Sequence, residues 1–361
     1  MQSNPLTSTS VESSPRPLVE GASRLSVLQR VKHRMAANAL LLGVIAVFVA
    51  FTLMNDRFLT VDNLRNISVQ ISVLAVVAVP MALLLIIGKV DLSVGSTLAL
   101  GAVTTGLLLN HGVAMTPAII LGVLTGAAIG LINGLLVETL ELSPIIVTLG
   151  ALTAVRGLAL TVAPDPIFNF PSSFLTLGEG QFLGIPYLSL IALVAIVIGA
   201  VVLMRLPVGR HVYAVGVNPE AAYLSGVRVS RLGLVVFLLT GAAAALAGVM
   251  LAARLGSAPS SSLGVGFELE VLTAVILGGV AFGGGRGTMF GVLLGIIFLG
   301  VLQNGLTLEN VPSSTGLIIK GGTLVAAAWL DRVTIRSEAV TMLLTSTGRR
   351  NDQDPDGSQN G

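Results

Sequence analysis

Long apolar runs recur along almost the whole chain, and this repetition restricts what the chain can fold into. A helix needs about 20 apolar residues to cross a hydrocarbon core about 30 Å thick. The runs are continuous, whereas the strands of a membrane barrel alternate apolar and polar residues. The 361 residues are 53% hydrophobic and only 11% charged, against about 25% charged in soluble domains. The sequence therefore predicts an all-α polytopic membrane protein with about ten transmembrane helices. The expected spans lie near 39–54, 67–87, 93–109, 114–137, 144–163, 185–204, 232–252, 269–283, 288–306 and 314–330.

The positions of the cations predict the orientation of these spans. Cytoplasmic loops of membrane proteins carry an excess of Lys and Arg. With a cytoplasmic N-terminus, only Arg57, Arg65 and Arg254 of the 20 Lys and Arg residues fall outside, and Arg156 and Lys320 fall within apolar runs. The remaining fifteen lie on the cytoplasmic side. We therefore expect both termini in the cytoplasm.

Polar segments divide the chain into three parts. Residues 1–35 are rich in Ser, Pro and Arg, show no cleavable-signal pattern, and are expected to form a disordered cytoplasmic tail. Residues 36–331 form the predicted transmembrane domain, and residues 332–361 a second cytoplasmic tail. The external segment 164–184 is expected to be an ordinary connector stiffened by prolines.

The cytoplasmic loop 205–231 contains the sequence pattern of a short helix. Asn218 suits the N-cap, Pro219 the first helical position and Glu220 the positive end of the helix dipole. Ala221 and Ala222 favour helix, and Gly226 suits the left-handed position after the last turn. Because two turns of helix are marginal alone, this helix must pack either on its own membrane helices or in a groove of a cytoplasmic partner.

Five stretches, in order, resemble one family of membrane proteins. They are 88–96 (GKVDLSVGS), 130–136 (GLINGLL), 145–150 (IIVTLG), 266–269 (GFEL) and 278–287 (GGVAFGGGRG). Together with the loop sequence GRHVYAVGVNPEAAYLSGVRV, they resemble the bacterial ribose-type permeases of ATP-driven importers, which belong to a wider group that also moves branched-chain amino acids. The resemblance covers about residues 36–331. Lys89 departs from it, because the family usually has Gly there.

The resemblance implies a sugar permease of the bacterial cytoplasmic membrane. It implies that a separate cytoplasmic ATPase docks on 216–226, that an extracytoplasmic binding protein delivers the solute, and that a second permease copy, identical or related, completes the path. The coupling residues implied are Gly216, Asn218, Pro219, Glu220, Ala221, Ala222 and Gly226. The other family-motif residues are Asp91, Ser93, Gly95, Asn133, Gly134, Glu268, Gly284, Gly285, Arg286 and Gly287.

Polar groups inside apolar helices are costly and suggest function. Thr148, Thr153 and Arg156 are candidates for the translocation path, with snorkelling of Arg156 to the outer interface as the alternative. Asp91 and Ser93 are expected to cap the following span, and Lys89 is near enough to pair with Asp91. Glu268, Glu270 and Lys320 are expected to be solvated charges at span ends, with pairing to Arg254 or a binding protein as the alternative for the two carboxylates.

Two rows of glycines recur every four residues, as in close helix contacts in membranes. They comprise Gly122, Gly126, Gly130 and Gly134, and then Gly287, Gly291 and Gly295. Packing within one chain is the favoured interpretation, and a subunit interface the alternative.

Catalytic and metal-binding patterns are not found in the sequence. The chain has no cysteine and no HExxH or GxSxG pattern. It also lacks the P-loop pattern, so a partner subunit must bind any ATP, and no cofactor or nucleic acid is expected. The alternatives to a sugar permease are a branched-chain amino acid permease and a stand-alone secondary transporter, which would need ion-coupling groups at mid-membrane.

Overall fold

The computed structural model describes residues 40–312 and 314–327, so the predicted tails lie outside the described residues. Its long helices are α2 (Val61–Ile86), α3 (Val94–Asn110), α4 (Met115–Glu138), α5 (Pro144–Val162), α7 (Tyr187–Arg205), α10 (Val229–Leu255) and α12 (Met289–Leu308). Its shorter elements are Leu40–Met54, α6 (Ser172–Glu179), β1 (Gln181–Phe182), β2 (Ile185–Pro186), α8 (Pro207–Val217), α9 (Pro219–Leu224), α11 (Phe267–Leu277) and Ser314–Ala327.

The predicted all-α architecture is confirmed, and each of the ten apolar runs contains a helix. Among the described residues, six helices are long and apolar enough to cross a membrane: α2, α4, α5, α7, α10 and α12. The helices Leu40–Met54, α3 and Ser314–Ala327 are apolar but shorter, and α11 has only 11 residues. Helices α3 and α11 each follow an irregular segment that the apolar pattern does not reveal.

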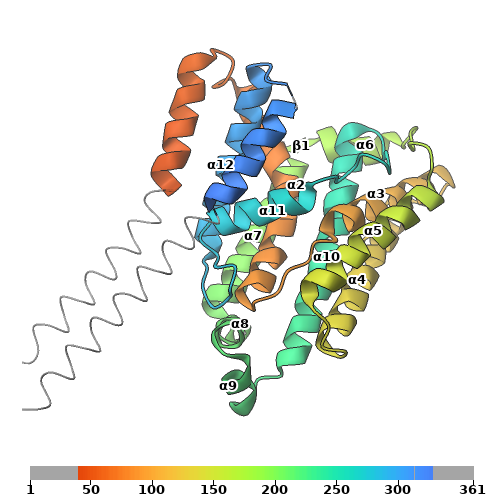
Figure 1. Ribbon diagram of the computed structural model, residues 1–361. Helices are drawn as coiled ribbons and strands as arrows, with labels where there is room; N and C mark the ends of the chain where they lie inside the picture. Colours follow the sequence, from red (N-terminus) through yellow and green to blue (C-terminus); the bar gives the residue numbers. More distant parts are fainter. Residues whose placement is uncertain (1–39, 313, 328–361) are drawn as a thin grey trace, which may run out of the picture. The chain divides into compact units, whose positions relative to one another are not determined.

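Helix α10 is the centre of the packing, since it contacts α4, α3 and α2 most extensively (Figure 1). A Cβ atom on Gly126 would lie 2.3 Å from the carbonyl oxygen of Gly241, and one on Gly241 would lie 2.2 Å from the carbonyl oxygen of Gly126. Likewise, a Cβ on Gly130 would lie 2.3 Å from the carbonyl oxygen of Phe237. The first glycine row therefore packs within the chain, as the favoured interpretation predicts.

The second glycine row also packs within the chain. A Cβ on Gly291 would lie 2.0 Å from the carbonyl oxygen of Gly278, and one on Gly295 would lie 2.1 Å from that of Ala274. These contacts bring α12 against α11. On its other side, α12 is held to α2 by a buried pair of carboxamides, in which Asn63 and Asn304 each donate to the other at 3.0 and 2.9 Å.

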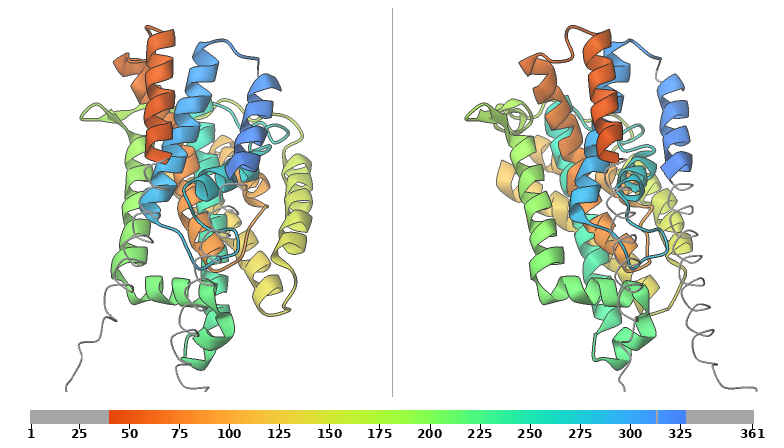
Figure 2. Two further views of the ribbon diagram at one scale, coloured as in Figure 1. Left: turned by 60° about the vertical axis from the view of Figure 1, so that its left-hand side comes forward. Right: turned by 90° about the vertical axis from the view of Figure 1, so that its left-hand side faces the viewer.

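The segment 164–184 is more structured than the connector that the sequence predicts. It contains α6 and, with the next two residues, the hairpin formed by β1 and β2. Ile167 and Ala258 exchange backbone hydrogen bonds of 3.3 and 2.9 Å, which tie this segment to the chain after α10. The hairpin protrudes sideways near the end of α7 that is remote from α9 (Figure 2).

The glycine contacts predict that adding one methyl group lowers stability at a glycine in close contact and not at one that faces open space. We expect Gly126→Ala to destabilise the protein by about 1–3 kcal/mol, because the added Cβ would overlap a backbone oxygen that cannot move freely. Gly150→Ala on α5 is the matched control, since a Cβ there meets nothing within 4 Å. Thermal unfolding of the purified protein in detergent measures the difference. Equal melting temperatures for the two variants would contradict the close packing.

Candidate functional site

The short helix predicted in the cytoplasmic loop is present as α9. The side chain of Asn218 accepts a hydrogen bond of 3.0 Å from the backbone N–H of Ala221, and Pro219 is the first helical residue. Glu220 lies in the first turn, and Gly226 has a φ of +86°. The local roles predicted for Asn218, Pro219 and Gly226 are therefore confirmed.

Helix α9 presents apolar side chains to the outside. Leu224 is 80% exposed and Tyr223 is 69% exposed, whereas Ala222 is buried. Helix α9 lies at one end of the described part and projects beyond α8 and the start of α10 in all three views (Figures 1 and 2). A helix of six residues is unstable alone, and its outer apolar surface has no cover within the described residues. This surface has the character of a docking site.

Sequence reasoning missed α8, which was interpreted as part of the loop. The available signals were Pro207, at a position suited to the first turn, and the spacing of Val212 and Val215, which are both buried. The hydroxyl of Tyr213 donates a hydrogen bond of 2.7 Å to the carbonyl oxygen of Gly287. Burial raises the pKa of Tyr213, so this hydroxyl keeps its proton and remains a donor.

The C-terminal end of α8 meets the end of α2 and the family-motif segment 278–287, with backbone atoms in close contact. The backbone N–H of Gly285 donates a hydrogen bond of 2.8 Å to the carbonyl oxygen of Ile86, the last residue of α2. A Cβ on Gly216 would lie 1.9 Å from that oxygen and 2.5 Å from the nitrogen of Gly285. Gly284 and Gly285 have φ values of +85° and +76°, which favour glycine. We call Ile86, Gly216, Gly284 and Gly285 the glycine junction.

Arg286 and Gly287 complete the loop that forms this junction. The carbonyl oxygen of Arg286 accepts a hydrogen bond of 3.0 Å from the N–H of Ala281, which closes the loop on itself. The fold thus brings together four glycines from two family-motif segments that are far apart in the sequence: Gly216, Gly284, Gly285 and Gly287.

A second group of family-motif residues forms a buried polar network next to the junction. The carboxylate of Asp91 accepts hydrogen bonds from the backbone N–H and the hydroxyl of Ser93, at 2.8 and 2.6 Å. The carboxamide of Asn133 donates to the hydroxyl of Ser93 at 2.9 Å, and all three side chains are buried. The expected capping of α3 by side chains is wrong in form: Ser93 is the N-cap but makes no side-chain cap, because its hydroxyl bonds to Asp91.

Lys89 pairs with Glu138, the last residue of α4, and not with Asp91 as predicted. The Glu138 side chain is 4% exposed and the Lys89 side chain is 19% exposed. A Cβ on Gly233, near the start of α10, would overlap the Glu138 carboxylate. Lys89 therefore neutralises a buried carboxylate where α4 meets α10.

Two other family-motif glycines allow close helix contacts. A Cβ on Gly95 would lie 2.3 Å from the carbonyl oxygen of Gly264 and 2.4 Å from the carboxylate of Glu268. A Cβ on Gly134 would lie 3.1 Å from the side chain of Phe237 on α10.

The candidates for the translocation path lie on one helix but in different surroundings. Thr148 is buried, Thr153 is exposed, and the hydroxyls of both donate to backbone oxygens of α5. The guanidinium of Arg156 donates to the carbonyl oxygens of Ser260, Leu263 and Gly95, at 2.8, 2.7 and 3.3 Å. Arg156 thus holds the segment between α10 and α11 against α3, and its role in transport stays a prediction.

The acidic residues of α11 are not the isolated solvated charges that the sequence predicts. Glu268 lies near enough to Arg156 for their charges to attract, and Glu270 pairs with Lys320 at 3.4 Å. Sequence reasoning missed this pair because its members come from different apolar runs.

Comparison with known proteins places these features in a family context. Residues 63–328 match the family model described as branched-chain amino acid transport system, permease component. The chain is 38% identical over 294 residues to the ribose import permease protein of Bacillus subtilis, an alignment that covers 81% of this chain and 91% of that protein. It is 37% identical to the L-arabinose ABC transporter permease protein of Azospirillum brasilense, over 80% and 85% of the two chains.

A third similar protein is the D-allose transport system permease protein of Escherichia coli K12. It is 36% identical to this chain, over 80% of this chain and 90% of that protein. No solved structure matches the chain.

Removal of Lys89 should destabilise the protein more than removal of a cation from an exposed ion pair. We expect Lys89→Met to destabilise the protein by about 3 kcal/mol, the low end of the range for a broken buried pair, because it leaves the Glu138 carboxylate unpaired. Arg65→Met is the matched control, since Arg65 pairs at 3.7 Å with the 90% exposed side chain of Asp62, and such pairs contribute about 0–1 kcal/mol. The measurement is thermal unfolding in detergent.

The double variant Lys89→Met/Glu138→Met tests whether the two effects are coupled. It should lose less stability than the two single variants together, because no charge is left unpaired. Additive losses would show that the two residues act independently.

Proposed function

Because the chain belongs to the branched-chain amino acid transport permease family, we propose that it is the membrane-spanning subunit of an ATP-driven importer for a monosaccharide. The observation that supports this most strongly is that sugar-importer permeases of three different specificities align over 80–81% of this chain. The family description mentions branched-chain amino acids, but these similar proteins import ribose, arabinose and allose. A permease subunit is not an enzyme in itself, so ATP hydrolysis belongs to a separate ATPase chain.

The proposed transporter has ten membrane segments and both termini in the cytoplasm. The distribution of cations supports this orientation, and it places α8, α9 and the glycine junction on the cytoplasmic side of a bacterial cytoplasmic membrane. An extracytoplasmic binding protein would deliver the sugar, and a second permease copy would complete the path.

Helix α9 is the proposed contact for the ATPase. Tyr223 and Leu224 would enter an apolar groove of the partner, while Glu220 and the cap at Asn218 keep the helix formed. Ala222 is buried against the chain itself, so its role is to hold α9 in place and not to touch the partner. Movement of α9 would reach the membrane helices through α10, which begins five residues after α9 ends.

Leu224→Glu tests this docking role. We expect it to reduce the amount of P-loop ATPase that co-purifies with the tagged chain by about tenfold or more, because a charge in an apolar interface is costly. Pull-down from solubilised native membranes, with quantification by mass spectrometry, measures the loss.

Leu140→Glu is the matched control. Leu140 is 61% exposed and lies in the connection between α4 and α5, on the same proposed side of the membrane. It should leave ATPase recovery unchanged. Unchanged recovery with Leu224→Glu would contradict docking at α9, and sugar uptake driven by an ion gradient without any ATPase would contradict the importer itself.

A further inference from the structure

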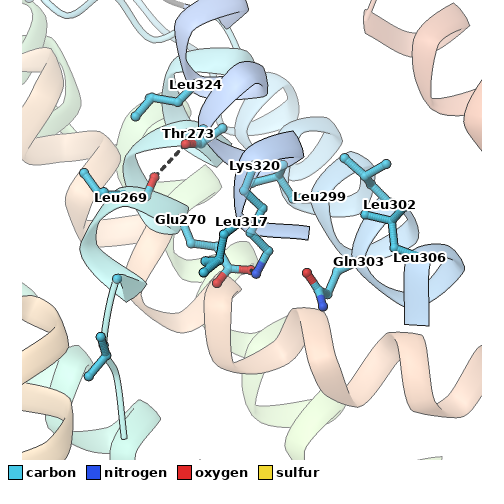
Figure 3. Close-up of a pocket in the computed structure, with 13 residues that line it drawn as sticks. Leu269, Glu270, Thr273, Leu299, Leu302, Gln303, Leu306, Leu317, Lys320 and Leu324 are labelled. Carbon is cyan, nitrogen blue, oxygen red and sulfur yellow. Dashed lines mark hydrogen bonds and ion pairs between the residues drawn. The ribbon is translucent and has the colours of Figure 1, made fainter. Parts of the chain in front are cut away.

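A cavity lies between α11, α12 and the helix Ser314–Ala327 (Figure 3). It has a volume of about 160 Å³, far more than the 10–15 Å³ or so that a single water needs. Leucine is the commonest residue in its wall, and Leu299, Leu302 and Leu306 are among the six leucines there. Four hydrogen-bonding side chains interrupt this apolar wall: Glu270, Thr273, Gln303 and Lys320.

The charged pair in this wall remains accessible from the cavity. Glu270 and Lys320 are 3.4 Å apart, and their side chains are 27% and 32% exposed. A carboxylate offers about four acceptor positions and an ammonium three donors, so one mutual contact leaves most of them unused. The pair presents both donors and acceptors while adding no net charge.

Gln303 provides an independent sign of a ligand. Its carboxamide oxygen is buried and has no hydrogen-bond partner among the described residues, although nearly all buried polar atoms have one. Its side chain lies across the cavity from Glu270 and Lys320 in Figure 3. The hydroxyl of Thr273 already donates to the carbonyl oxygen of Leu269 at 2.6 Å, which leaves its oxygen free to accept.

The third wall of the cavity is loosely packed. Added Cβ atoms on Gly316, Gly321 and Gly322 would meet nothing within 4 Å, and Leu317 is 69% exposed. The helix Ser314–Ala327 is therefore loosely packed along its first part, Ala327 at its end is buried, and Lys320 ties it to α11. Such a wall allows a solute to enter and leave.

We propose that this cavity binds the transported monosaccharide, with Glu270, Gln303 and Lys320 bonding to its hydroxyl groups and the leucines covering its C–H faces. This inference rests on the function proposed above. Sugar hydroxyls both donate and accept, so they match a carboxylate, an ammonium and a carboxamide placed around one cavity. An acyl chain would offer no hydrogen-bond donor to the Gln303 oxygen.

Gln303→Met tests the proposal, because it preserves the length of the side chain but removes its hydrogen bonds. The complete transporter, with its ATPase and binding protein, is reconstituted in proteoliposomes, and initial uptake of radiolabelled ribose, arabinose and allose is measured. The single-deoxy analogues of the sugar that is taken up are then compared. Thr307→Val, one turn further along α12 and outside the cavity wall, is the control.

The expected result is a selective loss. Gln303→Met should slow uptake of the parent sugar by about three- to tenfold, as for one lost hydrogen bond, and should not slow uptake of the deoxy analogue that lacks the hydroxyl bound by Gln303. ATPase activity stimulated by the loaded binding protein should persist in the variant, and Thr307→Val should behave as wild type. Gln303→Asn, which retracts the same carboxamide, should give the same pattern and decides the matter if Gln303→Met does not assemble.

Two results would overturn the proposal in distinguishable ways. Unchanged uptake in the Gln303 variants, or equal slowing of the parent sugar and every analogue, would show that the cavity does not bind sugar while leaving the importer function intact. Wild-type proteoliposomes that retain the ATPase but take up none of the sugars would overturn the proposed sugar specificity, and the cavity proposal with it.

Discussion

Backbone-to-backbone contact at glycines is the constraint on which the rest of this structure depends. Lipid tails are as apolar as leucine, so membrane helices associate through close packing and not through exclusion of water. Gly126 and Gly130 of α4 meet Gly241 and Phe237 of α10 at distances that leave no room for a Cβ. Helices α4 and α10, packed this densely, move as a unit, because a close-packed core transmits strain. Because α10 begins five residues after α9 ends, a displacement of the proposed ATPase contact would reach this packed core along the chain.

Helices α8 and α9 are attached to the rest of the protein at a second place, the glycine junction. There α8 meets the end of α2 and the loop before α12 largely through backbone atoms, and the hydroxyl of Tyr213 donates across to the carbonyl oxygen of Gly287. Displacement of α8 would therefore act on α2 and α12 together, while displacement of α9 acts on α10. Because α8 and α9 are attached to different helices, a shift of α8 and α9 would change the relative positions of those helices. Alternating access requires such a change.

Local features of the sequence were predictable because their causes are local. The cap at Asn218, the left-handed Gly226 and the packing faces of the glycine rows follow from neighbouring residues, and the structure has all three. Pairings across the fold were not predictable. Lys89 lies 49 residues from Glu138, and Glu270 lies 50 residues from Lys320, so each choice of partner depends on how the helices pack. Helix α8 was missed for a different reason, because loop 205–231 was interpreted around the stronger signal of α9.

Some polar side chains hydrogen-bond to irregular backbone and so have a structural role. Others are not used in this way and remain available to a solute. Non-helical backbone among membrane helices needs hydrogen-bond partners from the protein, because lipid offers none. Arg156 meets this need for the segment between α10 and α11, and Asp91, Ser93 and Asn133 meet it for the segment before α3. Polar residues that the sequence offers as candidates for a functional role are thus used to stabilise the two irregular segments, the one between α10 and α11 and the one before α3. Gln303, by contrast, is on a regular helix, and its side-chain oxygen has no hydrogen-bond partner in the described part of the chain. That part of the fold gives no reason for a carboxamide there, whereas a bound hydroxyl group does.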